Sequence, residues 1–184
     1  MKTYLLRVAG LKRQLSYFPI GNGLFVAGFV MLGDVELTVA CARELLERCP
    51  DYDYLITPEA KSIPLAMEMA RQRGDARYIV ARKQTKLYMR DPLRVVVKSI
   101  TTEQPQCLYL DGKDADMIEG KRVLIIDDVI STGNSLEAME QLAKAAGAFI
   151  AGRAAVLAEG NAAKRDDILF LERLPLFTAA EVGR

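Results

Sequence analysis

The stretch Val123–Ser135, with the sequence VLIIDDVISTGNS, places the strongest constraint on how this chain folds. It opens with an unbroken aliphatic run, which is typical of a strand buried on both faces of a parallel sheet. Asp127 and Asp128 follow this run, and a short polar turn then leads into a helical pattern. This order of strand, turn and helix predicts an α/β fold whose ligand lies beyond the carboxyl ends of the strands.

The turn itself has the composition of an anion-binding loop. It is formed by Ser131, Thr132, Gly133, Asn134 and Ser135. Free backbone N–H groups at a helix N-terminus favour phosphate, and hydroxyls beside a flexible glycine allow an anion to approach closely. The two carboxylates before the turn suit ribose hydroxyls or a divalent cation. The stretch therefore predicts a sugar-phosphate site. The alternative is an ordinary strand-to-helix turn whose aspartates are solvated or cap the helix.

Composition narrows the class of protein. A chain of 184 residues suits one domain, and its apolar runs are too short to cross a membrane. The formal charge of +1 gives no sign of a nucleic-acid-binding surface. The absence of histidine excludes Ser-His-Asp catalysis, Cys-His catalysis and HExxH zinc sites. Cys41, Cys49 and Cys107 are odd in number and lack CxxC spacing, so we expect reduced thiols in a cytoplasmic protein.

The rest of the chain alternates between strand and helix patterns around this stretch. Residues 1–33 read as short extended pieces and are expected to form an appendage or hood, while residues 50–177 form the ligand-binding core of a single domain, 1–184. Further strands are expected at 54–57, 77–81, 149–157 and 168–171. Asp34 is expected to cap a helix that runs to about Cys49, and further helices are expected from Ser62 onward and over 135–146. These patterns predict a twisted, mainly parallel sheet flanked by helices.

Three loops and a hairpin arm are expected to converge on one edge of this sheet. The loops 58–62, 82–86 and 131–135 each follow a strand, so they share the carboxyl edge. Strand-like runs at 94–100 and 106–110 predict a hairpin arm over the site. The first two loops supply the basic residues Lys61, Arg82, Lys83 and Lys86. These cations would hold the pyrophosphate end of a ligand whose other end is a phosphate; the alternative is that they are solvated.

The stretch 123–135 resembles the motif with which type I phosphoribosyltransferases bind phosphoribosyl pyrophosphate (PRPP). Residues 57–64 resemble the pyrophosphate loop of the adenine and xanthine branch, and residues 81–86 resemble the basic stretch that follows it there. The resemblance covers residues 50–177 and implies the type I phosphoribosyltransferase fold. It further implies a pentosyltransferase of purine salvage, commonly a homodimer, that joins a purine base to PRPP with Mg²⁺ and releases pyrophosphate. Neither nucleic acid nor a membrane is an expected partner.

The same resemblance implies roles for individual residues. The residues expected to bind PRPP are Lys61, Ser62, Arg82, Lys83, Lys86, Asp127, Asp128, Ser131, Thr132, Gly133, Asn134 and Ser135. Asp127 and Asp128 would hold the ribose diol, or the metal indirectly through PRPP, and the arm would close to exclude water. The expected catalytic residues are Arg82, Glu103, Asp127 and Asp128. Glu103 is chosen because adenine enzymes take a glutamate from this arm, although the local sequence here differs from their motif.

Glu159 carries the inference about the base. Xanthine enzymes place a lysine at this position, where it contacts the oxygens of the purine, whereas an ionised carboxylate only accepts hydrogen bonds. Glu159 would accept from an exocyclic amine, which favours adenine over xanthine or hypoxanthine. Ser131 stands where hypoxanthine–guanine enzymes have an aspartate that acts as a base. Glu159 and Val129 are the expected purine-binding residues; the alternative for Glu159 is a solvated residue at a strand end.

A protein of another class shares part of the pattern. Residues 156–160 resemble the PRPP-binding domain of purine-operon repressors, which binds PRPP as an effector without catalysis. Those repressors carry a winged helix for DNA, and the segment before residue 50 shows neither a helix-turn-helix pattern nor a basic face. A non-catalytic PRPP sensor that acts through a protein partner is therefore the alternative function. A purely structural α/β domain is a third possibility.

Overall fold

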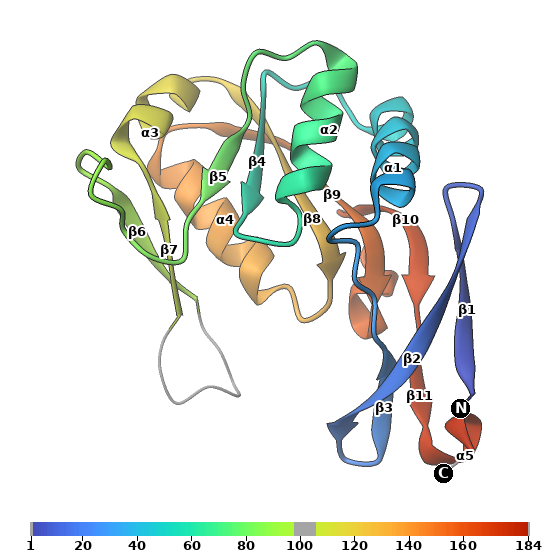
Figure 1. Ribbon diagram of the computed structural model, residues 1–184. Helices are drawn as coiled ribbons and strands as arrows, with labels where there is room; N and C mark the ends of the chain where they lie inside the picture. The colour runs from blue at the N-terminus through green and yellow to red at the C-terminus, as the bar shows by residue number, and fades with distance from the viewer. Residues whose placement is uncertain (1, 98–105, 184) are drawn as a thin grey trace.

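A five-stranded parallel sheet forms the centre of the computed structural model, which describes residues 2–97 and 106–183 (Figure 1). Its strands, in the order β10-β9-β8-β4-β5, are β4 (Tyr54–Pro58), β5 (Ile79–Ala81), β8 (Arg122–Ile130), β9 (Phe149–Glu159) and β10 (Leu169–Leu174). Every pairing within this sheet is parallel. All five carboxyl ends therefore lie at one edge, and the predicted fold class is confirmed.

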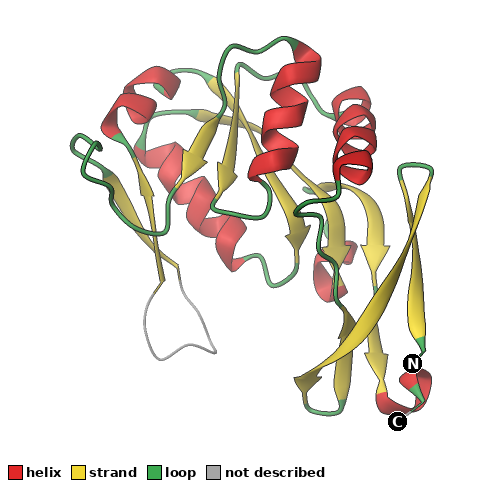
Figure 2. Cartoon of the chain, viewed as in Figure 1, coloured by secondary structure: helices red, strands yellow, loops and turns green. Residues whose placement is uncertain are grey.

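Helices cover both faces of this sheet, and the sequence of β8 shows why. Leu124 and Ile126 pack in one hydrophobic cluster with α1 (Val35–Arg48) and α2 (Ile63–Arg73). Val123 and Ile125 point the other way, into a second cluster with α3 (Gly112–Ile118) and α4 (Asn134–Ala145). Figure 2 shows these helices in red around the yellow strands. Because successive side chains of a strand point to opposite faces, burial on both faces accounts for the unbroken aliphatic run.

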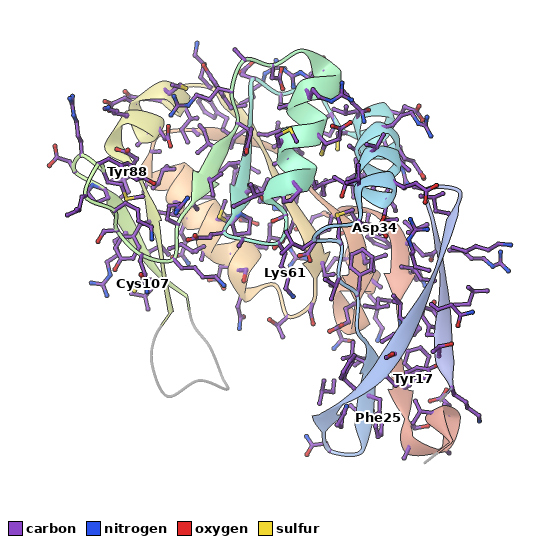
Figure 3. The ribbon with its side chains drawn as sticks, viewed as in Figure 1. Tyr17, Phe25, Asp34, Lys61, Tyr88 and Cys107 are labelled. Atoms are coloured by element: carbon purple, nitrogen blue, oxygen red, sulfur yellow. The ribbon has the colours of Figure 1, made fainter. Side chains whose placement is uncertain are left out.

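The segment before α1 forms a second, antiparallel sheet with the end of the described chain. Its strands, in the order β1-β2-β3-β11, are β1 (Thr3–Val8), β2 (Leu11–Gly21), β3 (Leu24–Ala27) and β11 (Leu176–Thr178). Tyr17 on β2, labelled in Figure 3, meets the ring of Phe177 on β11 edge-on, with centroids 4.9 Å apart. Leu6 and Leu15 are buried in the same cluster as α1. This sheet thus packs through one face on the core.

The hairpin arm consists of β6 (Leu93–Val97) paired antiparallel with β7 (Gln106–Leu110). In Figure 1 the arm and the second sheet lie on either side of the edge at which the arrowheads of the parallel strands end. The last part of the strand expected at 94–100 and the candidate Glu103 lie outside the described residues. Among the helices described, none is both long and apolar enough to span a membrane.

Several short elements were not predicted from the sequence. They are α3, the 3₁₀ helix η1 (Gly160–Lys164), β11 and α5 (Ala179–Val182). The helix α3 begins after Asp111, whose carboxylate accepts a hydrogen bond from the backbone N–H of Lys113. The same kind of cap was recognised at Asp34, which accepts from the N–H of Leu37 and starts α1 as expected. The helix α1 was predicted and α3 was not because α3, with 7 residues against 14, is too short to show the helical repeat of apolar residues in its sequence.

Candidate functional site

A cavity of about 210 Å³ opens at the carboxyl edge of the parallel sheet, where three strand ends and the arm meet. It is lined by Pro58, Glu59, Ala60, Lys61, Ser62, Lys83, Cys107, Leu108, Asp127, Asp128, Val129 and Ser135. Figure 3 labels Lys61 in the loop between β4 and α2 and Cys107 on the arm. Each of the loops predicted to converge on this edge, 58–62, 82–86 and 131–135, contributes at least one residue to the lining of the cavity.

Two adjacent carboxylates form the floor of this cavity at the end of β8. Asp127 accepts a hydrogen bond of 2.9 Å at Oδ1 from the backbone N–H of Asp128. Asp128 is only 6% exposed, and its Oδ2 has no hydrogen-bond partner among the described residues. Burial and the neighbouring Asp128 carboxylate raise the pKa of Asp127 above its ordinary value. The pair therefore offers an unsatisfied acceptor, Oδ2 of Asp128, to a hydroxyl group or to a cation.

The turn after β8 has the geometry of an anion-binding loop. Gly133 occupies the N-cap position of α4 with φ +86°, a left-handed conformation that a side chain would strain. Glycine has no side chain to cap the helix, so the backbone N–H groups of the first turn face outward without a capping group. The hydroxyl of Ser131 donates a 2.6 Å hydrogen bond to Oε1 of Glu159 at the end of β9. The predicted purine-binding carboxylate is thus held against the predicted phosphate turn.

The loop between β4 and α2 is tied to the end of β8 by buried hydroxyls. Oγ1 of Thr57 lies 2.9 Å from the carbonyl oxygen of Ile126 and 2.8 Å from Oγ of Ser62. Both hydroxyl residues are almost fully buried. The loop also contains a cis peptide bond between Glu59 and Ala60. Ser62 therefore holds the loop in place beside the carboxylate pair, while the exposed Lys61 lies at the cavity.

Glu59 connects this loop with the basic stretch after β5, a link that was not predicted from the sequence. Its Oε2 accepts a 2.9 Å hydrogen bond from the backbone N–H of Lys83, and its Oε1 lies 3.4 Å from Nη2 of Arg82. The backbone of Arg82 pairs in both directions with Tyr109 on β7, at 2.8 Å. Its Nε is buried and has no hydrogen-bond partner among the described residues. The carboxylate of Glu59 thus sets the position of two predicted anion-binding residues.

The structure brings together part of the predicted site at the cavity itself. The predicted residues that line it are Lys61, Ser62, Lys83, Asp127, Asp128, Val129 and Ser135. Those in the adjoining loops and strand end, outside its lining, are Arg82, Lys86, Ser131, Thr132, Gly133, Asn134 and Glu159. Glu103 lies in the undescribed part of the arm. Within the described ranges no three His, Cys, Asp or Glu side chains form a metal-binding group, so the aspartate pair alone is an incomplete set of ligands.

Comparisons with known proteins identify similar chains. Residues 32–175 match the family described as phosphoribosyl transferase domain. The hypoxanthine/guanine phosphoribosyltransferase of Methanocella arvoryzae is 34% identical over 151 residues, which are 81% of this chain and 72% of that protein. The xanthine phosphoribosyltransferase of Exiguobacterium sp. is 31% identical over 139 residues, 74% of this chain and 70% of that protein. The fold is similar to the crystal structure of adenine phosphoribosyltransferase from Thermoanaerobacter pseudethanolicus, with a TM-score of 0.70, 19% identity and coverage of 86% of this chain and 95% of that one.

Proposed function

This chain belongs to the phosphoribosyl transferase family, and from that membership we propose that it joins adenine to PRPP as a purine phosphoribosyltransferase. The observation that carries the proposal is the arrangement around the cavity. An anion-binding turn, a carboxylate pair and a basic loop lie at one sheet edge in the order that a doubly phosphorylated sugar requires. The relatives named above act on different purines, so the choice of base rests on this chain's own residues.

PRPP would bind with its 5-phosphate and its pyrophosphate at opposite ends of the site. The 5-phosphate would be bound by the turn 131–135 at the N-terminus of α4. The ribose hydroxyls would donate to the carboxylates of Asp127 and Asp128, which satisfies the unpartnered Oδ2 of Asp128. The pyrophosphate would contact the cations of the loops that follow β4 and β5. These cations are Lys61, Arg82, Lys83 and Lys86.

The carboxylate pair also fits a magnesium ion that is carried on the substrate. Mg²⁺ is usually held by one or two carboxylates together with phosphate oxygens and water, which matches the pair at the end of β8. Asp127 and Asp128 would hold it indirectly, through the ribose hydroxyls of PRPP. When bound, the ion would neutralise charge on the pyrophosphate and make it a better leaving group.

The chain's own residues would act mainly by positioning and by electrostatics. Cleavage of the C1–O bond leaves its electron pair on pyrophosphate and positive charge on the ribose ring. A basic loop stabilises the departing anion, and the carboxylates of Asp127 and Asp128 stabilise the ring charge. A purine nitrogen then forms the new bond to C1. No histidine is needed for these tasks, in agreement with the composition. Glu103 remains the predicted acceptor of the proton that the purine loses.

The contact between Glu159 and Ser131 supports adenine as the base. The hydroxyl of Ser131 occupies Oε1 of Glu159, so Oε2 is left to accept from a group in the site. Adenine offers an exocyclic amine, whereas hypoxanthine and xanthine present carbonyl oxygens that an ionised carboxylate repels. A residue that accepts hydrogen bonds at this point therefore discriminates between the two classes of purine.

The proposal is tested by measuring pyrophosphate release and AMP formation from adenine, PRPP and Mg²⁺. The matched control is the double variant Asp127→Asn, Asp128→Asn, which keeps the side-chain shapes but removes both charges. We expect wild-type turnover and a loss of at least about a hundredfold in the variant. Binding of PRPP without turnover on any purine would instead favour the PRPP sensor. Equal PRPP binding by wild type and variant would favour a structural domain.

A further inference from the structure

Arg165 lies against the turn that is proposed to bind the 5-phosphate, although no motif in the sequence marks this residue. It follows η1, after the end of β9. Its Nη1 lies 3.0 Å from the point at which a Cβ atom on Gly133 would stand. Gly133 is the N-cap residue of α4, so the guanidinium is next to the backbone N–H groups of the first turn. A cation at this point faces the same space as the anion-binding turn.

A bidentate ion pair with the carboxylate of Asp167 holds the guanidinium of Arg165 in place. Nε and Nη2 of Arg165 donate to Oδ1 and Oδ2 of Asp167, at 2.8 and 2.7 Å. These bonds use one edge of the planar group, and Nη1 makes no hydrogen bond within the described parts of the chain. A bidentate pair of this kind fixes orientation as well as position. Its remaining N–H groups are therefore free to bind an anion at the turn.

Asp167 is in turn linked to α4, the helix that begins at the phosphate turn. Its Oδ2 lies 3.9 Å from Nε of Arg153 on β9, and the same Nε donates a 2.6 Å hydrogen bond to Glu140 on α4. Lys144, one turn further along the helix, lies 3.6 Å from the other oxygen of Glu140. The chain of contacts therefore ties the segment that carries Arg165 to the helix whose N-terminus it faces.

We propose that Arg165 is a further residue of the 5-phosphate subsite, where Asp167 orients its guanidinium so that Nη1 donates to a phosphate oxygen beside Gly133. This assignment depends on the proposed function, because the 5-phosphate belongs to PRPP. It adds a charged side chain to a subsite otherwise built from backbone N–H groups and hydroxyls. It also gives a second reason for glycine at position 133, since a Cβ there would stand 3.0 Å from Nη1 of Arg165 and displace the guanidinium, in addition to straining the backbone.

A purely structural role for Arg165 predicts a different set of results. The ion pair with Asp167 is partly exposed, with side chains 37% and 44% accessible, and such pairs contribute little to stability. Arg165→Gln is therefore expected to fold and to unfold at nearly the same temperature as wild type. A role in binding must then appear in affinity for the phosphate end of the substrate and not in affinity for pyrophosphate, which binds at the other end.

The experiment compares two ligands that each carry one end of PRPP. Ribose 5-phosphate and pyrophosphate are titrated calorimetrically into wild type, Arg165→Gln, Arg165→Lys and Lys164→Gln. Lys164 is exposed and adjacent, so its variant loses the same charge without touching Gly133. We expect Arg165→Gln to weaken ribose 5-phosphate binding about tenfold, the usual loss for one charge-assisted hydrogen bond, with pyrophosphate affinity unchanged within about twofold. Arg165→Lys should recover part of the loss, and Lys164→Gln should match wild type.

Four outcomes would overturn this assignment. Ribose 5-phosphate binding that is unchanged in Arg165→Gln would show that Nη1 does not reach the phosphate. An equal loss for both ligands, or an equal loss in Lys164→Gln, would indicate a general charge effect. If Arg165→Gln does not fold, Arg165→Lys is compared with wild type instead. The lysine keeps the positive charge but cannot form the planar, bidentate contact with Asp167, so weaker binding of ribose 5-phosphate alone would support the assignment. Failure of wild type itself to bind ribose 5-phosphate would contradict the proposed function together with this residue, and is thereby distinguished from failure of Arg165 alone.

Discussion

Ser131 donates a 2.6 Å hydrogen bond to Oε1 of Glu159, which joins the phosphate turn after β8 to the end of β9. The contact links two parts of the proposed site that have different tasks. Ser131 belongs to the turn that would hold the sugar phosphate, and Glu159 would face the purine. Because the hydrogen bond from Ser131 fixes Oε1 of Glu159, it also fixes the orientation of the carboxylate and thus the position of Oε2. Under the proposed function, this one side-chain contact would couple the choice of base to the position of the sugar phosphate.

Reversing the charge at position 159 should change the preferred base. In Glu159→Lys an acceptor becomes a donor, so kcat/KM for adenine should fall about tenfold or more while that for hypoxanthine or xanthine rises. Steady-state rates of nucleotide formation with each base measure this. Glu47→Lys is the matched control, since Glu47 is exposed on α1, on another part of the surface. An unchanged ratio of rates in Glu159→Lys would show that this carboxylate does not contact the base.

Replacing Asp127 by asparagine should stabilise the free protein while it inactivates the enzyme. The raised pKa of Asp127 means that burial beside Asp128 disfavours its charged form. Asparagine is neutral, so it avoids the cost of burying a charge here and the repulsion from Asp128, and it keeps an oxygen to accept the N–H of Asp128. We expect a gain of about 1 kcal/mol or more in the free energy of unfolding, measured by urea denaturation at pH 7.5 without PRPP.

The control for this variant is Asp166→Asn, an exposed change that removes the same charge. It should leave the free energy of unfolding within about 0.5 kcal/mol of wild type. A lower stability for Asp127→Asn than for wild type would show that the carboxylate pair is satisfied in the free protein, contrary to the unpartnered Oδ2 of Asp128.

Removing the side chain of Glu59 should weaken binding of pyrophosphate without unfolding the protein. In Glu59→Ala the N–H of Lys83 and the guanidinium of Arg82 lose the acceptor that sets their positions. We expect a loss of about tenfold in pyrophosphate affinity, while ribose 5-phosphate binds as before. Isothermal titration with the two ligands separates these effects, and Glu47→Ala serves as the control. Equal weakening of both ligands, together with a lowered melting temperature, would indicate a structural role for Glu59 instead.

The contact between Arg13 and Asp34 predicts how stability depends on pH. Nε of Arg13 on β2 lies 2.6 Å from Oδ2 of Asp34, the N-cap of α1 that Figure 3 labels. Hydrogen bonds from Arg13 hold the pKa of Asp34 below its ordinary value. Because the folded-state pKa is lowered, this contribution is present above the unfolded-state pKa of about 4 and is lost as pH falls through the lowered value.

Asp34→Asn isolates this contribution, since asparagine caps a helix nearly as well as aspartate. The variant should lose about 1 kcal/mol at pH 7 and match wild type at a pH below the folded-state pKa of Asp34. Urea unfolding of both proteins across this range measures the difference. A loss of the same size at every pH would show that the interaction does not depend on the charge of Asp34.

The parts of the site that could be predicted are those encoded in consecutive residues. The stretch Val123–Ser135 contains its strand, carboxylates and turn in one piece, so the fold class and the position of the cavity follow from it. Asp34 was recognised for the same reason, because a cap and its helix are adjacent in the sequence. Likewise, the loops after β4 and β5 were placed by the rule that parallel strands end at one edge.

The contacts that could not be predicted join residues far apart in the sequence. Glu59 reaches Lys83, and Arg165 reaches Gly133, only because of the register between strands and the way each loop turns. Nothing in the local sequence of Glu59 or Arg165 distinguishes it from a solvated charge. The pairing of β11 with β3 is similar, because three residues near the end of the described chain pair with a strand near its beginning.

The most direct test of the central claim is a comparison of kcat/KM for adenine, hypoxanthine, guanine and xanthine at saturating PRPP and Mg²⁺, with pyrophosphate release and nucleotide identity both recorded. We expect kcat/KM for adenine to exceed that for hypoxanthine and xanthine, which lack an exocyclic amine, by about tenfold or more, as one well-placed acceptor can provide. Preference for xanthine or hypoxanthine would contradict the role given to Glu159. PRPP binding without nucleotide formation from any of the four bases would contradict the proposed activity itself.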